Sequence, residues 1–187
     1  MLAPRGWHCF GTYGSNGESL FISPEPISTT DFFGKTRWPG LNIGIQLTIS
    51  DGNTSGRFEI ARTIARVFPK HMGFARAVIA EQIEPTKDFP RGPYPKDLLH
   101  HVSPELVEFT TPANQQGLGT HSWIKRARTP IEGMVQLRGG FVNASDDPFM
   151  ASVYMRLPPE LSPMRDEILH DVEYTDSLEF SLNLAQP

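Results

Sequence analysis

The sequence predicts an α+β fold in which a mainly antiparallel sheet of about seven strands packs with two or three helices on one of its faces. Several segments alternate apolar and polar residues, which is the pattern of strands that have one wet face. One segment, residues 58–68, instead repeats its apolar residues at helical intervals. The 187 residues are 39% apolar, which is enough for one hydrophobic core. We therefore expect a single domain over residues 1–187.

Three segments show the strand alternation most clearly. Apolar residues take every second position at 44–50, at 149–157 and at 178–184. Strands of parallel sheets are usually apolar on both faces, so this alternation favours antiparallel pairing. Weaker patterns complete the expected sheet at residues 7–13, 19–23, 106–111 and 134–138.

The clearest helix is expected after the turn cluster at 51–56, whose hydroxyl residues suit a helix start. Its apolar residues recur at intervals of three and four up to Phe68, and Pro69 ends the pattern. A shorter apolar run predicts a second helix over 74–83. Residues 162–173 are expected to form a third.

An irregular loop is expected at about 84–104, because five prolines fall between residues 85 and 104. Proline fixes φ and removes a backbone donor, so a segment this rich in proline is a poor regular element. Long loops of this kind are often lids, binding loops or oligomer arms. A functional role and a purely structural role both stay open.

Composition restricts the partners. A net charge of −4 disfavours general binding to nucleic acid or to an anionic membrane, since both require a basic face. No apolar run approaches the roughly 18 residues that span a bilayer. The one cysteine, Cys9, excludes an internal disulfide and a cysteine-based zinc site. We expect no metal site and no cofactor.

Two glycine-rich blocks carry most of the candidate site. Residues 5–17 combine aromatic residues, a histidine and the cysteine with four glycines, and residues 111–123 combine amide and aromatic residues with His121. The predicted helix start at 54–57 adds an anion-binding alternative to simple capping. The candidate ligand-binding residues are Trp7, His8, Tyr13, Asn16, Arg57, Tyr94, Asn114, His121 and Trp123.

An enzyme is the first alternative. Residues 14–17 resemble a nucleophile elbow around Ser15, but Tyr13 stands where that motif requires glycine, and Asn-Gly favours a hairpin turn. Cys9 and His8 are adjacent in a predicted strand and so point to opposite faces. A hydrolase would therefore need Cys9 or Ser15 as nucleophile and a distant histidine, such as His121, as base.

Four blocks together resemble a group of bacterial proteins to which no activity has been assigned. They are LAPRGWHCFGxYGSNG at 2–17, TSGRFE at 54–59, FPxGPYP at 89–95 and TPANxxGLGT at 111–120. The resemblance extends to about Leu157 and implies no substrate or site residue. In that group the first block often follows an exported segment, whereas this chain begins at Met1. The expected location is either the cytoplasm or, with a signal that this chain does not contain, outside it.

The favoured interpretation is a binding or interaction domain with a pocket for a small polar ligand or a peptide. The pocket is expected where the 7–17 hairpin, the 85–104 loop and the 111–123 block meet. Besides the hydrolase, a structural module that oligomerises remains an alternative. It would form a homo-dimer through an edge strand.

Overall fold

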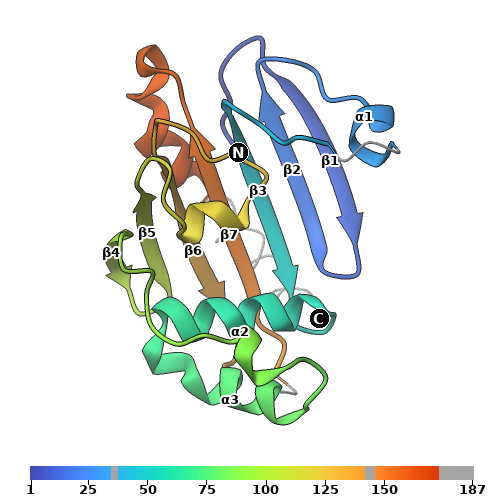
Figure 1. The fold of residues 1–187 in the computed structure, drawn as a ribbon, viewed down its shortest axis with the longest axis vertical. Helices are drawn as coiled ribbons and strands as arrows, with labels where there is room; N and C mark the ends of the chain where they lie inside the picture. Colours follow the sequence, from blue (N-terminus) through green and yellow to red (C-terminus); the bar gives the residue numbers. More distant parts are fainter. Residues whose placement is uncertain (35–37, 142–145, 173–187) are drawn as a thin grey trace, which may run out of the picture.

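A seven-stranded antiparallel sheet forms the centre of the protein in a computed structural model that describes residues 1–34, 38–141 and 146–172 (Figure 1). The strands lie in the order β1-β2-β3-β7-β6-β5-β4, and every neighbouring pair is antiparallel. The α+β class with a mainly antiparallel sheet is therefore confirmed. The strands are β1 (His8–Gly14), β2 (Gly17–Ser23), β3 (Gly44–Asp51), β4 (Leu98–Ser103), β5 (Leu106–Thr111), β6 (Ile131–Arg138) and β7 (Phe149–Arg156).

The helices connect and cover the strands. Helix α1 (Thr29–Phe33) follows β2, and helices α2 (Gly56–Val67) and α3 (Met72–Ala80) follow β3. Residues 164–172 form a further helix after β7. Short 3-10 turns lie at η1 (Pro69–His71), η2 (Thr86–Asp88), η3 (Leu118–His121) and η4 (Pro159–Leu161). In Figure 1, α2 crosses the sheet near one end of its strands, and η3 lies above α2 over the same face.

The sheet has a hydrophobic cluster on each face. Alternation along β7 sends Met150 and Tyr154 to the face covered by α2 and α3, here called the first face. Val153 and Met155 point to the second face, where Ile168, Leu169 and Val172 of the last helix pack. Two helices, α2 and α3, thus pack on one face as predicted, whereas the helix at 164–172 packs on the other. Apolar side chains at second-face positions of β3, β6 and β7 need a cover of their own.

Strand β4, the last in the order of the sheet, lies where an irregular loop was expected. Prolines 95 and 104 flank β4, but no proline falls between them, so residues 98–103 can pair with β5. The predicted loop is wrong over this stretch. The strand predicted at 178–184 lies outside the described residues. Among the described residues, no helix has the length and apolar character needed to span a membrane.

The β1–β2 hairpin places its turn against the start of α2. Gly14 and Gly17 pair across a two-residue turn, and Gly17 has a φ of +123°. A side chain at Gly17 would clash with the Ile49 carbonyl oxygen of β3, so glycine allows this close approach. The Ser55 hydroxyl donates to the Ser15 carbonyl oxygen over 2.8 Å. These contacts fix one side of the cavity described next.

Candidate functional site

Polar side chains occupy the middle of the first face, where a sheet covered by helices would ordinarily bury apolar residues. They come from β2, β3 and β7 and comprise Ser19, Gln46, Thr48, Ser50, Ser152 and Tyr154. We call these six residues the polar floor. Gln46 is 4% exposed and Ser152 is 1% exposed. Because burial of polar groups costs free energy, this floor is the most informative departure from an ordinary core.

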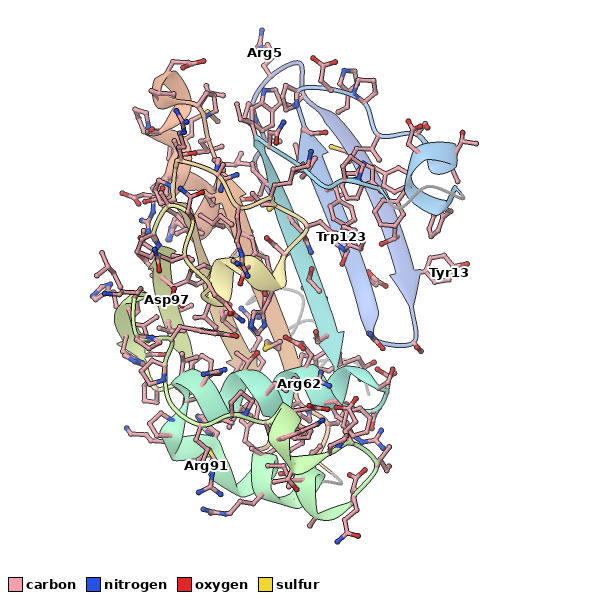
Figure 2. All side chains as sticks on the ribbon, in the orientation of Figure 1. Arg5, Tyr13, Arg62, Arg91, Asp97 and Trp123 are labelled. Atoms are coloured by element: carbon pink, nitrogen blue, oxygen red, sulfur yellow. The ribbon has the colours of Figure 1, made fainter. Side chains whose placement is uncertain are left out.

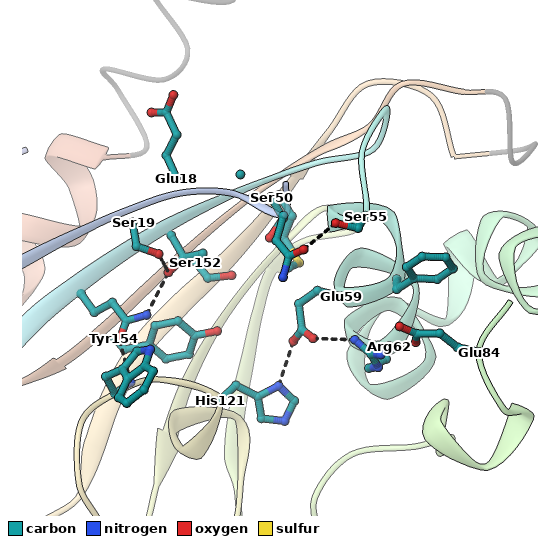
Figure 3. Close-up of a pocket in the computed structure, with 17 residues that line it drawn as sticks. Glu18, Ser19, Ser50, Ser55, Glu59, Arg62, Glu84, His121, Ser152 and Tyr154 are labelled. Atoms are coloured by element: carbon teal, nitrogen blue, oxygen red, sulfur yellow. Dashed lines mark hydrogen bonds and ion pairs between the residues drawn. The ribbon is translucent and has the colours of Figure 1, made fainter. Parts of the chain in front are cut away.

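A cavity of about 580 Å³ lies over the polar floor (Figure 3). Its walls are Phe58, Glu59 and Arg62 of α2, the η3 residue His121, and Trp123 just beyond. Asn16 of the hairpin turn closes another side. Cavities of this size are typical of small-molecule sites, although such sites usually have more apolar linings.

Hydrogen bonds set the orientation of the floor residues. Thr48 Oγ1 lies 3.1 Å from Ser19 Oγ and accepts a hydrogen bond of 3.0 Å from Gln46 Nε2. The Gln46 Oε1 atom accepts from the backbone N–H of Trp123 over 2.7 Å. Gln46 thus links the floor to the loop above it, and its amide orientation is fixed by one donor and one acceptor.

Two floor residues on β7 retain hydrogen-bonding capacity. Ser152 Oγ is buried and makes no hydrogen bond of normal geometry with any described residue, although its proximity to Tyr154 acts against the rise in the pKa of the phenol that burial causes. Burial raises the pKa of Tyr154, and the charge of Glu59 raises it further. The phenol is therefore protonated and can donate. Both residues line the cavity.

A chain of polar contacts runs along the α2 wall. Tyr94 Oη lies 2.8 Å from His121 Nε2, and His121 Nδ1 lies 3.0 Å from Glu59 Oε1. Arg62 donates to Glu59 Oε2 over 3.1 Å and also pairs with Glu84. The Arg66 guanidinium lies 4.0 Å from the centre of the Tyr94 ring. The chain joins α2 to the 85–97 segment through one histidine.

Glu59 is ionised in this setting. Burial raises the pKa of its carboxyl, but the hydrogen bond and charge of His121, together with Arg62, outweigh burial and hold the pKa below its ordinary value of 4.5. The lining holds three glutamates, Glu18, Glu59 and Glu84, and one arginine, Arg62. The cavity is therefore net negative, and its arginine already binds carboxylates.

Asp97 and Arg156 hold the 111–130 segment over the floor. Asp97 accepts hydrogen bonds of 2.8 Å from the Leu118 N–H and from Thr111 Oγ1. Burial raises the pKa of this carboxyl, against the effect of those hydrogen bonds. Arg156, at the end of β7, donates to the carbonyl oxygens of Asn42, Lys125, Thr129 and Pro130. The segment is thus tied to the sheet at both ends.

An aromatic cluster adjoins the cavity at Trp123. The Trp123 ring lies 5.5 Å from Trp38 and 5.8 Å from Phe32, measured between ring centres. Phe21 and Phe10 extend the cluster into the β1–β2 hairpin. Trp123 is 37% exposed, so it presents an aromatic surface at the rim.

The structure brings four of the predicted site residues together. Asn16, His121 and Trp123 line the cavity, and Tyr94 contacts His121. The remaining five lie elsewhere. Trp7 packs against the second-face cluster, His8 and Tyr13 are exposed on β1, Arg57 pairs with Glu81, and Asn114 lies in a turn with a φ of +58°.

Sequence reasoning missed the floor and most of the α2 wall. Gln46, Thr48 and Ser50 alternate with apolar residues, and that alternation was interpreted as a face in contact with bulk water. The available signal was that β3 is followed directly by a long amphipathic helix, which has to cover one of its faces. Glu59 and Arg62 fall outside the apolar spacing of that helix, which is the pattern of a side exposed to solvent.

The contacts predicted for a hydrolase are not among those that the described residues make. Cys9 is exposed on β1, and the Ser15 hydroxyl donates to Asn16 Oδ1. His121 instead contacts Glu59 and Tyr94. Within residues 1–34, 38–141 and 146–172, no group of three or more His, Cys, Asp or Glu side chains has an arrangement suited to a metal ion.

The fold and the site together define an α+β protein with a polar cavity set on the central strands of its sheet. Comparison with protein-family models, with curated proteins and with solved structures found no significant match.

Proposed function

We propose that this protein binds a small, neutral, hydroxyl-rich molecule, such as a sugar or a polyol, in the cavity over the polar floor. The observation that carries the proposal is the buried Ser152 hydroxyl, which lines the cavity without a hydrogen bond of normal geometry. A buried polar group without a partner costs about 1–3 kcal/mol. A ligand hydroxyl that reaches Ser152 and the Tyr154 phenol would recover that cost.

The chemistry of the lining favours a ligand that can both donate and accept hydrogen bonds. Hydroxyls of Ser19, Thr48, Ser50 and Ser152 do both, whereas Glu59 only accepts. A molecule with several hydroxyl groups matches such a mixture at every position. The exposed face of Trp123 provides an apolar surface for the C–H face of a ring.

Charge argues against an anionic ligand. Three glutamates face one arginine in the lining, and that arginine is engaged by Glu59 and Glu84. A phosphate or carboxylate would meet like charges and find no unengaged arginine to pair with. The same reasoning makes a sugar a better candidate than a sugar phosphate.

The test is a thermal-shift screen of neutral monosaccharides and polyols beside the phosphates of the same sugars. Binding to the native state raises Tm by mass action, so we expect a dose-dependent rise with a neutral compound and none with its phosphate. Isothermal titration then gives Kd for the compound that binds.

Ser152→Ala is the decisive variant, and Thr110→Ala is its matched control. Thr110 lies next to Phe109 on β5, points to the second face and is absent from the cavity lining. We expect Ser152→Ala to have an unliganded Tm at least as high as that of the wild type, because the unpartnered hydroxyl is gone, and to bind about tenfold more weakly, the value of one lost hydrogen bond. A sugar phosphate that binds better than the neutral sugar, or unchanged binding in Ser152→Ala, would refute the proposal.

A further inference from the structure

A second concave surface lies on the side of α2 away from the polar floor. This groove has a volume of about 380 Å³ and lies between the end of α2, the start of α3, the 91–93 segment and β4. Its floor is apolar, with Val67, Met72 and Leu99 among the residues that form it. Figure 2 shows Arg91 on this side of α2, remote from Trp123. The groove is therefore separate from the sugar site proposed above.

The groove is basic in a protein of net charge −4. Arg66, Arg76, Arg91 and His101 line it, and no acidic residue does. Arg66 is held in place by the Gly92 carbonyl oxygen and the Tyr94 ring. Arg76 and Arg91 are exposed, and the ion pairs found among the described residues include neither. Two unneutralised guanidinium groups thus flank an apolar floor.

Strand β4 gives the groove a backbone edge. It is the last strand of the sheet and pairs with β5 alone among the described strands. Leu99 and His101 point into the groove, while Leu98 and Val102 are 68% and 48% exposed. An edge strand with exposed apolar residues and unpaired backbone groups is a template for another strand.

We propose that β4 and this basic groove dock an extended acidic peptide segment of a partner protein, which adds to the sheet as an eighth strand. A strand paired with β4 would run about 4.8 Å from it, with alternate side chains over the groove. An apolar side chain at a central position would contact Leu99 and Met72. Carboxylates two residues to either side would meet Arg76 and Arg91.

The probe is a heptapeptide, TETLTET, labelled with an uncharged fluorophore and measured by fluorescence anisotropy against the full chain. Its leucine and two glutamates fall on one face of a strand, as the groove requires. Two control peptides separate the contribution of charge from that of strand pairing. TKTLTKT reverses the charge, and PEPLPEP keeps the charges and the leucine but is a poor strand, because proline holds φ near −65° and removes every second N–H. We expect both to bind at least about tenfold more weakly than TETLTET.

The protein variants test the same assignment. Arg76→Glu/Arg91→Glu should weaken TETLTET binding by about tenfold or more, because like charges then face each other. Arg126→Glu/Arg128→Glu makes the same charge change at two exposed arginines outside the groove and should leave Kd within about twofold. Circular dichroism checks that both variants are folded. Ser152→Ala should leave peptide binding unchanged, so failure of the sugar proposal and failure of this one are distinguishable.

Four results would overturn the assignment. Equal binding of PEPLPEP would mean that the peptide does not bind as a strand, and equal loss in the Arg126 and Arg128 variant would place the contact elsewhere. Absence of TETLTET binding would also refute it. Sedimentation of the free protein tests for the fourth, because a dimer that dissociates in the Arg76 and Arg91 variant would make a second copy of this chain the occupant.

Discussion

Arg156 makes an unusual number of hydrogen bonds to distant parts of the chain for a single side chain. It is 5% exposed, and its guanidinium donates to four backbone carbonyl groups and to no described carboxylate. A planar guanidinium has donors enough for all four, whereas an ammonium has three and a different geometry. The residue therefore connects β7 to segments that lie 26 to 114 positions away in the sequence.

We expect Arg156→Met to lower the free energy of unfolding by about 3 kcal/mol or more, since several buried carbonyl groups lose their donor. Urea unfolding followed by fluorescence measures the change. Arg128→Met is the control, because Arg128 is exposed and should change stability by less than about 0.5 kcal/mol. Equal stability of the two variants would show that water replaces the guanidinium at those carbonyl groups.

The start of α2 depends on a glycine for packing and not for backbone freedom. A Cβ atom on Gly56 would lie 2.5 Å from the Asn16 carbonyl oxygen and 2.6 Å from that of Asp51. Both are backbone atoms, so they cannot move out of the way as the tip of a side chain can. The β1–β2 turn and the helix thus meet at a position that admits only hydrogen.

Gly56→Ala should therefore destabilise the protein by about 1–3 kcal/mol, although alanine is the better helix former. Thermal unfolding gives the comparison with Gly14→Ala, where the added Cβ meets nothing within 4 Å. A rise of Tm in Gly56→Ala would mean that the hairpin turn separates from α2 at little cost.

The contact between η3 and α2 makes stability depend on pH. The folded-state pKa of Glu59 lies below its ordinary value of 4.5, so its contribution is present above that value and is lost as pH falls through the folded-state pKa. We expect Glu59→Gln to flatten the decline of unfolding free energy between about pH 5 and about pH 3. Chemical denaturation across that range measures the slope.

His121→Gln tests the cause of that dependence. If the histidine sustains the low pKa of Glu59, this variant should flatten the same part of the pH curve. An unchanged curve in both variants would assign the acid sensitivity to other carboxyl groups. Asp97 acts in the opposite direction, since its raised pKa gives a contribution that is lost as pH rises.

At the scale of the whole molecule, the sheet is best supported at its centre. Strands β3, β6 and β7 have neighbours on both sides, and β6 and β7 contribute to the hydrophobic clusters on both faces, whereas β1 and β4 are edges. We expect amide hydrogen exchange to be slowest in β3, β6 and β7 and fastest in β1 and β4. Mass spectrometry of peptides from the exchanged protein measures these rates, and equal protection of β1 and β7 would contradict the prediction.

Periodicity in the sequence predicted most elements because the alternation at 44–50 and the helical spacing after it are long and regular. It did not show which polar face would be covered, since Gln46 and Thr48 have the same pattern whether water or a loop lies above them. His121 and Trp123 could be predicted from their polar, glycine-rich block. Glu59 could not, because its partner His121 is 62 residues away and no local spacing records that contact.

Because Arg156 holds the 125–130 segment, the residues that fix the position of this segment differ from the residues that line the cavity. Arg156 extends from the same strand as Ser152 and Tyr154, so one end of the segment above the floor is held by a side chain that does not line the cavity. Side chains between 112 and 123 can then change while Arg156 still holds that end, and the hydrogen bonds from the Leu118 and Trp123 N–H groups are kept because they come from the backbone. Substitutions in this one loop would therefore change which ligand binds without changing the fold.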